Sequence, residues 1–196
     1  MKVPRLVQVG GKLAIICVIA AVVLGLVNAV TAPVIVENRA RALALGLNAV
    51  AAGSGQPGAT VGEATMIPEL ESVTAAYPVI GSDGQSIGWV LQIVGEGYGG
   101  DMNMLAGYFP SGELFAAKLM ENQETPGLGK KAESPEYMEK FLNQGGATRI
   151  PVSKTDLEGN EADSITGATI TFIGIARALS DGSEVARQLI AEGGEQ

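Results

Sequence analysis

The stretch from Asp163 to Thr171 carries four hydroxyl side chains around two residues that have almost no side chain. An apolar pattern typical of a helix follows, so Thr169 is expected at the start of a helix (Ile170, Ile173, Ala176, Leu179). Free backbone N–H groups and the positive end of the helix dipole make such a position a good anion site. Gly167 and Ala168 would let a bulky group approach the backbone. A Thr in this context is more often a simple helix cap, and the segment alone leaves both interpretations open.

Two glycine-containing segments precede this stretch. Gly97-Tyr98-Gly99-Gly100 lies between two predicted hairpins, and Glu124-Thr125-Pro126-Gly127-Leu128-Gly129 follows the second. Glycines let a backbone turn tightly or let a group come near, while proline fixes the loop. A turn is the default interpretation of each segment. The more specific interpretation is that each segment forms a wall of a cofactor pocket.

The surrounding pattern predicts an α+β fold, in which flanking helices pack on an antiparallel sheet. Hairpins are expected over 73–94 and 102–120, because strand-like runs there are joined by Gly-containing turns. Ser134 and Pro135 predict the start of a helix that runs to about residue 144. A short strand over 149–152, a polar loop over 155–163 and a closing helix over 170–192, bent near residue 182, complete the pattern. The expected sheet core includes Trp89, Tyr108, Phe109 and Phe115.

Residues 13–36 form an uncharged apolar run between Lys12 and Glu37. As a helix of 24 residues at about 1.5 Å each, it would span roughly 36 Å, more than the ~30 Å of a bilayer core. A cleaved signal peptide is the rival interpretation, but the run is too long and Pro33 would follow the cut. A retained, single-pass membrane anchor is therefore expected.

Charge predicts the orientation of this anchor. Lys2, Arg5 and Lys12 precede it without an acidic neighbour, which favours a cytoplasmic N-terminus over 1–12. The transmembrane helix over 13–36 would then be followed by a linker helix and loop over 37–58. A domain over 59–196 would lie on the periplasmic or extracytoplasmic side of the cytoplasmic (inner) membrane.

The composition excludes several classes of function. From residue 37 onward the chain has 10 Lys and Arg against 21 Asp and Glu, a formal net charge of −11 that repels nucleic acid. There is no histidine, and the one cysteine, Cys17, lies in the apolar run. Iron–sulfur clusters, typical zinc sites and histidine-dependent nucleophiles are thereby excluded. Redox chemistry in this chain would require an organic cofactor.

Taken together, the three segments resemble the covalent FMN-binding domain of membrane ion-pumping flavoproteins, especially the G subunit of the Rnf ion-translocating complex. In that family the last Thr of an Asp-x-x-(Ser/Thr)-Gly-Ala-Thr motif carries FMN through a phosphoester bond. Residues 163–169 match this motif without departure. The two glycine-containing segments resemble family segments that help form the flavin pocket. A single N-terminal membrane helix precedes the domain, as it does in the Rnf protein.

The resemblance implies that Thr169 tethers FMN and that the ring, rather than a side chain or a metal, transfers the electrons. It implies that the partners are membrane lipid and the other membrane and peripheral Rnf subunits, which include a second flavinylated subunit. It also implies a flavin transferase that uses FAD and a divalent metal. Asp163 is hypothesised to be recognised by that transferase. The other implied pocket residues are Thr166, Gly167, Ala168, Tyr98, Gly99, Gly100, Glu124, Thr125, Pro126, Gly127, Leu128 and Gly129.

The expected function is that of a membrane-anchored electron carrier in an Rnf-type ferredoxin:NAD oxidoreductase. Two alternatives remain at this point. One is the related C subunit of the sodium-pumping NADH:quinone reductase, which is a larger protein. The other is a non-redox anchored domain that binds a ligand or organises a complex.

Overall fold

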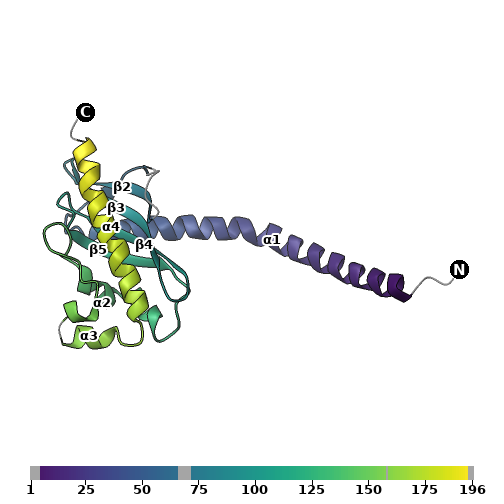
Figure 1. Cartoon of the computed structure of the whole chain (residues 1–196). Helices are drawn as coiled ribbons and strands as arrows, with labels where there is room; N and C mark the ends of the chain where they lie inside the picture. Colours follow the sequence, from purple (N-terminus) through teal and green to yellow (C-terminus); the bar gives the residue numbers. More distant parts are fainter. Residues whose placement is uncertain (1–4, 66–71, 158, 194–196) are drawn as a thin grey trace. The chain divides into compact units, whose positions relative to one another are not determined.

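The computed structural model describes residues 5–65, 72–157 and 159–193, which fall into two units, Met1–Ala42 and Leu43–Gln196 (Figure 1). Helix α1 (Arg5–Ala52) supplies the described part of the first unit and the beginning of the second. Its most apolar window has a mean hydropathy of 2.9 and is not buried at all. Among the described residues, α1 is the one helix long and apolar enough to cross a membrane, and the predicted span over 13–36 lies within it.

The separate helix expected after the anchor is instead a continuation of α1, which ends only at Ala52. Ala, Leu and Arg dominate residues 39–47, and these are strong helix formers with no proline among them. The compact second unit begins at Leu43, upstream of the predicted boundary at residue 59. The physical reason is that Leu47, Val50 and Ala51 are buried against the sheet.

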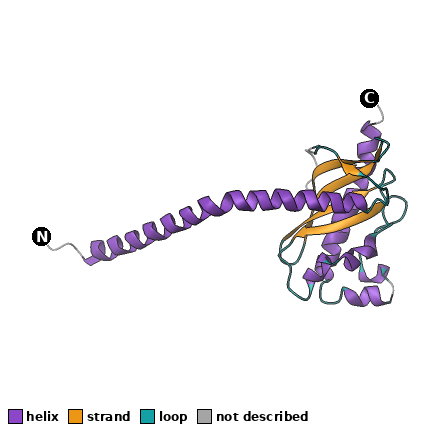
Figure 2. Cartoon of the chain, turned by 180° about the vertical axis from the view of Figure 1, so that it is seen from behind, coloured by secondary structure: helices purple, strands orange, loops and turns teal. Residues whose placement is uncertain are grey.

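In its described residues, the second unit is built on an antiparallel sheet of five strands in the order β1-β2-β3-β4-β5, drawn in orange in Figure 2. Each strand pairs with its neighbour in sequence, as in a meander. The two predicted hairpins are confirmed as β2–β3 and β4–β5. The strands are β1 (Thr60–Val61), β2 (Val73–Ile80), β3 (Ser86–Glu96), β4 (Asp101–Tyr108) and β5 (Leu114–Glu121).

Both faces of this sheet are covered, because successive side chains of a strand point to opposite sides. In β3, Val90 belongs to the cluster that holds the end of α1, whereas Leu91 and Ile93 belong to the cluster that holds helix α4 (Thr169–Gly193). Tyr108 and Phe115 are buried as expected, while Trp89 and Phe109 are partly buried. The sheet is therefore the middle layer between two helical segments.

Helix α4 packs along β3 and β4 through a face that recurs every three or four residues. The buried residues of its first half include Phe172, Ile175, Ala176 and Leu179. The helix is continuous through Gly182, near which a bend was expected. A Cβ at Gly182 would lie 2.6 Å from the hydroxyl of Tyr108, which explains the glycine by close packing.

The segment between β5 and α4 differs most from the expectation. Ser134 does cap a helix by accepting from the Tyr137 N–H, but α2 (Pro135–Met138) gives way to a 3-10 turn, η2 (Glu139–Phe141). Residues 149–152 are not a strand, since Ile150 and Pro151 are buried outside the sheet and Pro151 has no N–H to donate. The predicted polar loop over 155–163 contains parts of two short helices, η3 (Lys154–Asp156) and α3 (Asn160–Ser164). The remaining element is η1 (Gly129–Glu133), which follows β5.

Candidate functional site

Thr169 is the first residue of α4 and its side chain is exposed. The first helical hydrogen bond runs from the Phe172 N–H to the Ala168 carbonyl at 3.0 Å, which makes Ala168 the residue that precedes the helix proper. Thr169 therefore does not occupy the cap position, and it remains open to solvent. The first backbone N–H groups of a helix have no partner within it, so this hydroxyl belongs to a turn that can offer donors to an anion.

The turn before α4 depends on Gly167, whose φ of +85° is a conformation that other residues rarely adopt. This turn places Ile165 fully in the core and Ala168 nearly so, while Thr169 remains outside. A Cβ at Gly167 would lie 3.0 Å from the Leu128 side chain. The Thr-Pro-Gly-Leu-Gly loop therefore lies directly beside the turn that leads to Thr169.

Glu124 joins the three segments singled out in the sequence. It is only 3% exposed, and its carboxylate accepts two hydrogen bonds from other segments. The Gly99 N–H donates to Oε1 at 2.9 Å, and the Thr171 hydroxyl donates to Oε2 at 2.6 Å. Hydrogen bonds to a charged acceptor are stronger than neutral ones. One buried carboxylate thus connects the Gly-Tyr-Gly-Gly segment, its own loop and the first turn of α4.

Close approach to this carboxylate explains two of the glycines. A Cβ at Gly97 or at Gly129 would collide with a carboxylate oxygen of Glu124. Tyr137 also lies near this carboxylate; its buried hydroxyl has no hydrogen-bond partner among the described residues. Burial, and secondarily the Glu124 charge, raise the pKa of the Tyr137 phenol. Glu124 therefore links these segments inside the domain, and its predicted part in binding a cofactor stays a prediction.

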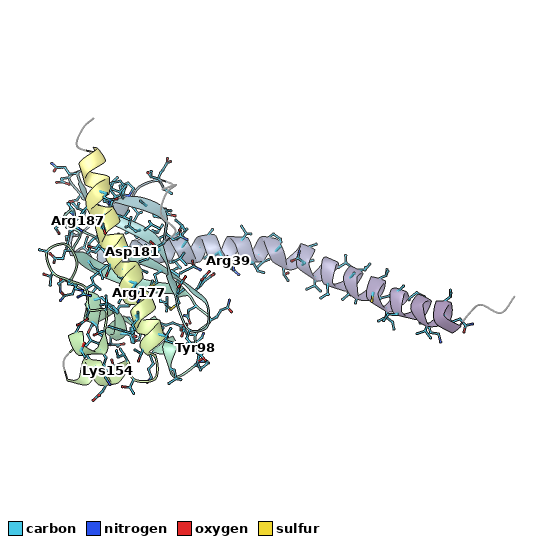
Figure 3. All side chains as sticks on the ribbon, in the orientation of Figure 1. Arg39, Tyr98, Lys154, Arg177, Asp181 and Arg187 are labelled. Carbon is cyan, nitrogen blue, oxygen red and sulfur yellow. The ribbon has the colours of Figure 1, made fainter. Side chains whose placement is uncertain are left out.

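Exposed apolar side chains gather around Thr169. In the described part of the second unit, four large apolar residues are exposed, and three of them belong to the segments that meet here. They are Tyr98 at 73%, Leu128 at 42% and Ile170 at 54% exposed. Figure 3 shows Tyr98 close to the start of α4. Such a group of unburied apolar side chains marks a surface that can hold an apolar ligand.

The polar side of the site contains a lysine that the sequence did not indicate. Lys154 Nζ donates to the Thr166 hydroxyl at 3.0 Å and lies 4.0 Å from an Asp163 carboxylate oxygen. The Asp163 side chain is 85% exposed near the end of α3. Lys154 comes from η3, twelve residues before Thr166, and no local pattern links it to the motif. It brings a positive charge to the exposed side of the Thr-Gly-Ala-Thr turn.

The hydroxyl groups of the motif are not equivalent. Thr171 is 1% exposed and its hydroxyl is bound to Glu124, so it is inaccessible to a modifying enzyme. Thr166 is exposed, but its hydroxyl accepts from Lys154. Thr169 combines exposure with the N-terminus of a helix of 25 residues. Of the remaining predicted residues, Thr125, Pro126, Gly127 and Gly100 lie exposed in the flanking turns.

Comparison with known proteins identifies the domain. The pattern of the FMN-binding domain family matches residues 97–184, which include all three segments. The G subunit of the Na⁺-translocating ferredoxin:NAD⁺ oxidoreductase complex of Acetobacterium woodii is 30% identical over 196 aligned residues, covering 93% of this chain and 90% of that protein.

Shorter matches connect the chain to further relatives. The G subunit of an ion-translocating oxidoreductase complex of Haemophilus influenzae is 34% identical over 82 residues, which are 39% of this chain and 38% of the relative. The G subunit of the proton-translocating ferredoxin:NAD⁺ oxidoreductase complex of Clostridium ljungdahlii is 27% identical over 100 residues, 51% of this chain and 54% of the relative. The chain therefore belongs to the G-subunit family of ion-translocating oxidoreductase complexes, with an FMN-binding domain over residues 97–184.

Proposed function

We propose that this chain is the membrane-anchored electron-transfer subunit of an ion-translocating ferredoxin:NAD oxidoreductase complex and carries FMN as a phosphoester of Thr169. The observation that carries this proposal is the exposed Thr169 at the N-terminus of α4, bordered by Tyr98, Leu128 and Ile170. The family assignment favours the Rnf-type protein over its counterpart in the NADH:quinone reductase. FMN supplies the electron transfer, and the chain supplies binding and position.

The tether requires a separate flavin transferase with FAD as the donor. A bond forms between Thr169 Oγ and the FMN phosphorus, the pyrophosphate bond of FAD breaks, and AMP leaves. The hydroxyl proton passes to a base of the transferase. Since Asp163 and Lys154 are exposed beside the Thr-Gly-Ala-Thr turn, they offer that enzyme one acidic and one basic contact. Asp163 is accordingly proposed as a recognition residue for the transferase.

After attachment, the chain's own groups hold the phosphate and shelter the ring. The free N–H groups and dipole of the first turn of α4 stabilise an anion by about 0.3–1 kcal/mol. Gly167 leaves room beside the backbone, and the exposed apolar side chains of Tyr98, Leu128 and Ile170 offer a surface for the ring. Glu124 links the Gly-Tyr-Gly-Gly segment to the first turn of α4 through its hydrogen bonds with Gly99 and Thr171.

The membrane helix α1 keeps this carrier beside its partner subunits in the lipid bilayer. The basic residues at the N-terminus favour a cytoplasmic start, which directs the FMN domain to the extracytoplasmic side. A covalent bond suits this location, because free FMN lost from that side could not readily be recovered. A second flavinylated membrane subunit is the proposed neighbour in the electron path.

The test is flavin attachment in cells that co-express the full chain and a flavin transferase. Flavin fluorescence should persist in the denatured chain on a gel, and should be lost in Thr169→Ala but kept in Thr166→Ala. Thr171→Val should also keep it, because its hydroxyl is buried. Peptide mass spectrometry should find FMN on the peptide that contains Thr169. An unlabelled parent chain would refute the carrier role, whereas a labelled Thr169→Ala would refute only the site.

A further inference from the structure

A groove of about 710 Å³ lies between the exposed side of α4 and the end of β3 with the beginning of β4. Its bottom is formed where helix and strand meet. There a Cβ at Gly95 would lie 2.9 Å from the Gly174 carbonyl oxygen and 3.2 Å from the Ala178 Cβ. All three residues are buried and line the groove. Because they add only backbone and one methyl group, the groove stays open between its two walls.

The helical wall of the groove has an apolar part and a charged part. Ile173, Arg177 and Asp181 are spaced four residues apart, so they follow one another along one side of α4. Ile170 also lines the groove, but it belongs to the apolar group around Thr169. From Ile173 to Asp181 the wall extends roughly 12 Å, at about 1.5 Å per residue. An extended chain covers this length with about four residues.

The groove has an excess of negative charge. Its lining contains the carboxylates of Glu96, Asp101 and Asp181 and one cationic group, the guanidinium of Arg177. All four residues are exposed, and no hydrogen bond or ion pair to another described residue engages their side chains. Glu96 and Asp101 lie directly opposite each other across β3 and β4, where like charges repel. A cation from a partner would relieve this repulsion.

The shape of the groove indicates what kind of cation fits. No group of three or more acidic side chains among the described residues could hold a metal ion. A lysine or arginine side chain suits the groove, because its methylene stem can lie on Ile173 and Val94 while its charged head reaches the carboxylates. Nucleic acid and anionic lipid surfaces carry the same sign of charge as the groove and are repelled.

We propose, on the basis of the subunit role in the proposed function, that this groove is a docking site for a neighbouring subunit of the complex. That subunit inserts a short extended segment that carries a lysine or arginine. The cationic head lies between Asp181 and the pair formed by Glu96 and Asp101, and Arg177 donates to a backbone carbonyl of the segment. Docking does not depend on the attachment of FMN. The docked segment would begin about one turn of α4 beyond Thr169, beside the proposed carrier.

Carboxylate footprinting tests this docking. The full chain, purified in detergent either alone or within its complex, is treated with a carbodiimide and glycine ethyl ester, which label accessible Asp and Glu side chains. Mass spectrometry should find much less labelling of Glu96, Asp101 and Asp181 in the complex than in the free chain. Glu184 is the control, since it is exposed on α4 but does not line the groove. Its labelling should be the same in both samples.

Charge variants show whether the occupant is cationic; Figure 3 labels Arg177 and Asp181 on the same stretch of α4. Asp181→Lys should weaken docking by about tenfold or more, because it brings like charges together. Glu96 and Asp101 should then regain the labelling of the free chain. The matched change Glu184→Lys should leave them protected. Arg177→Gln should keep them protected to a higher salt concentration than the parent, since it removes the groove's own cation.

Equal labelling of the three carboxylates in the free chain and in the complex would overturn the docking site. So would protection that survives both Asp181→Lys and high salt, because charge would then not hold the occupant. Without glycine ethyl ester, the carbodiimide couples a carboxylate to a nearby lysine, and coupling to a second copy of this chain would also contradict the proposal. A chain that does not co-purify with the complex overturns the subunit role and the docking site with it, whereas missing flavin overturns only the tether.

Discussion

Glu124 illustrates how one residue determines the geometry of the whole site. Its carboxylate is buried, and its two oxygens hold Gly99 on one side and Thr171 on the other. A buried charge is tolerated only when hydrogen bonds compensate for its lost hydration. Here those bonds are also the links between segments that are 25 and 47 residues away in sequence.

Glu124→Gln is expected to lower the free energy of unfolding by about 1–3 kcal/mol, because an amide has one acceptor oxygen and replaces two charge-assisted hydrogen bonds by neutral ones. Urea unfolding followed by the fluorescence of the single tryptophan, Trp89, measures this. Glu184→Gln is the control, since Glu184 is exposed on α4. A loss of equal size in both variants would contradict the role assigned to Glu124.

At the scale of elements, the contact between α4 and β3 determines which side of α4 is available to a ligand. Gly174 lies where the helix crosses the end of β3, and a Cβ there would collide with the backbone oxygen of Glu96. Both residues also line a groove between α4 and the end of β3. The absence of a side chain at Gly174 therefore sets the distance between helix and sheet.

Gly174→Ala should destabilise the domain by roughly 1–3 kcal/mol through overpacking. The sign of this change in unfolding free energy is informative, because Ala in place of Gly within a helix otherwise stabilises a protein by up to about 1 kcal/mol. Thermal unfolding followed by circular dichroism provides the comparison. Gln188→Ala, an exposed substitution in the same helix, should stay within about 0.5 kcal/mol of the parent. A stabilised Gly174→Ala would show that α4 is packed less closely than described.

At the scale of the whole molecule, the chain consists of a membrane-spanning unit and a sheet domain that begins at Leu43. The end of α1 belongs to this domain. Leu47, Val50 and Ala51 pack with Tyr77, Val90 and Phe115 on one face of the sheet. That face would be exposed to water without them.

A truncated chain of residues 43–196 should therefore fold as a soluble domain, whereas residues 59–196 should not. Burial of Leu47 and Val50 contributes about 1.5–3 kcal/mol each, and domains of this size have only about 5–15 kcal/mol in total. Solubility on expression and cooperative urea unfolding distinguish the two forms. Equal stability of the two would place the domain boundary at residue 59 after all.

The sequence determined those features that depend on composition or on neighbours in the chain. The apolar run over 13–36 defined the membrane span, and the absence of histidine together with a single cysteine excluded most metal chemistry. Alternating runs and turn glycines defined both hairpins. The order of residues 163–169 indicated a helix start at Thr169, because capping and turn chemistry are local. The strand expected over 149–152 was wrong, because whether an extended segment pairs depends on a distant partner.

Tertiary structure decided which side chains of the site are accessible. The spacing of Ile170, Ile173, Ala176 and Leu179 predicts a helix. The sheet buries Ala176 and Leu179 together with Phe172 and Ile175, and it leaves Ile170 exposed. Packing against β3 therefore sets the rotation of α4. The same rotation turns Thr171 inward to Glu124 and leaves Thr169 in solvent. The motif indicated Thr169 as the proposed point of attachment, and contacts distant in sequence determined its surroundings.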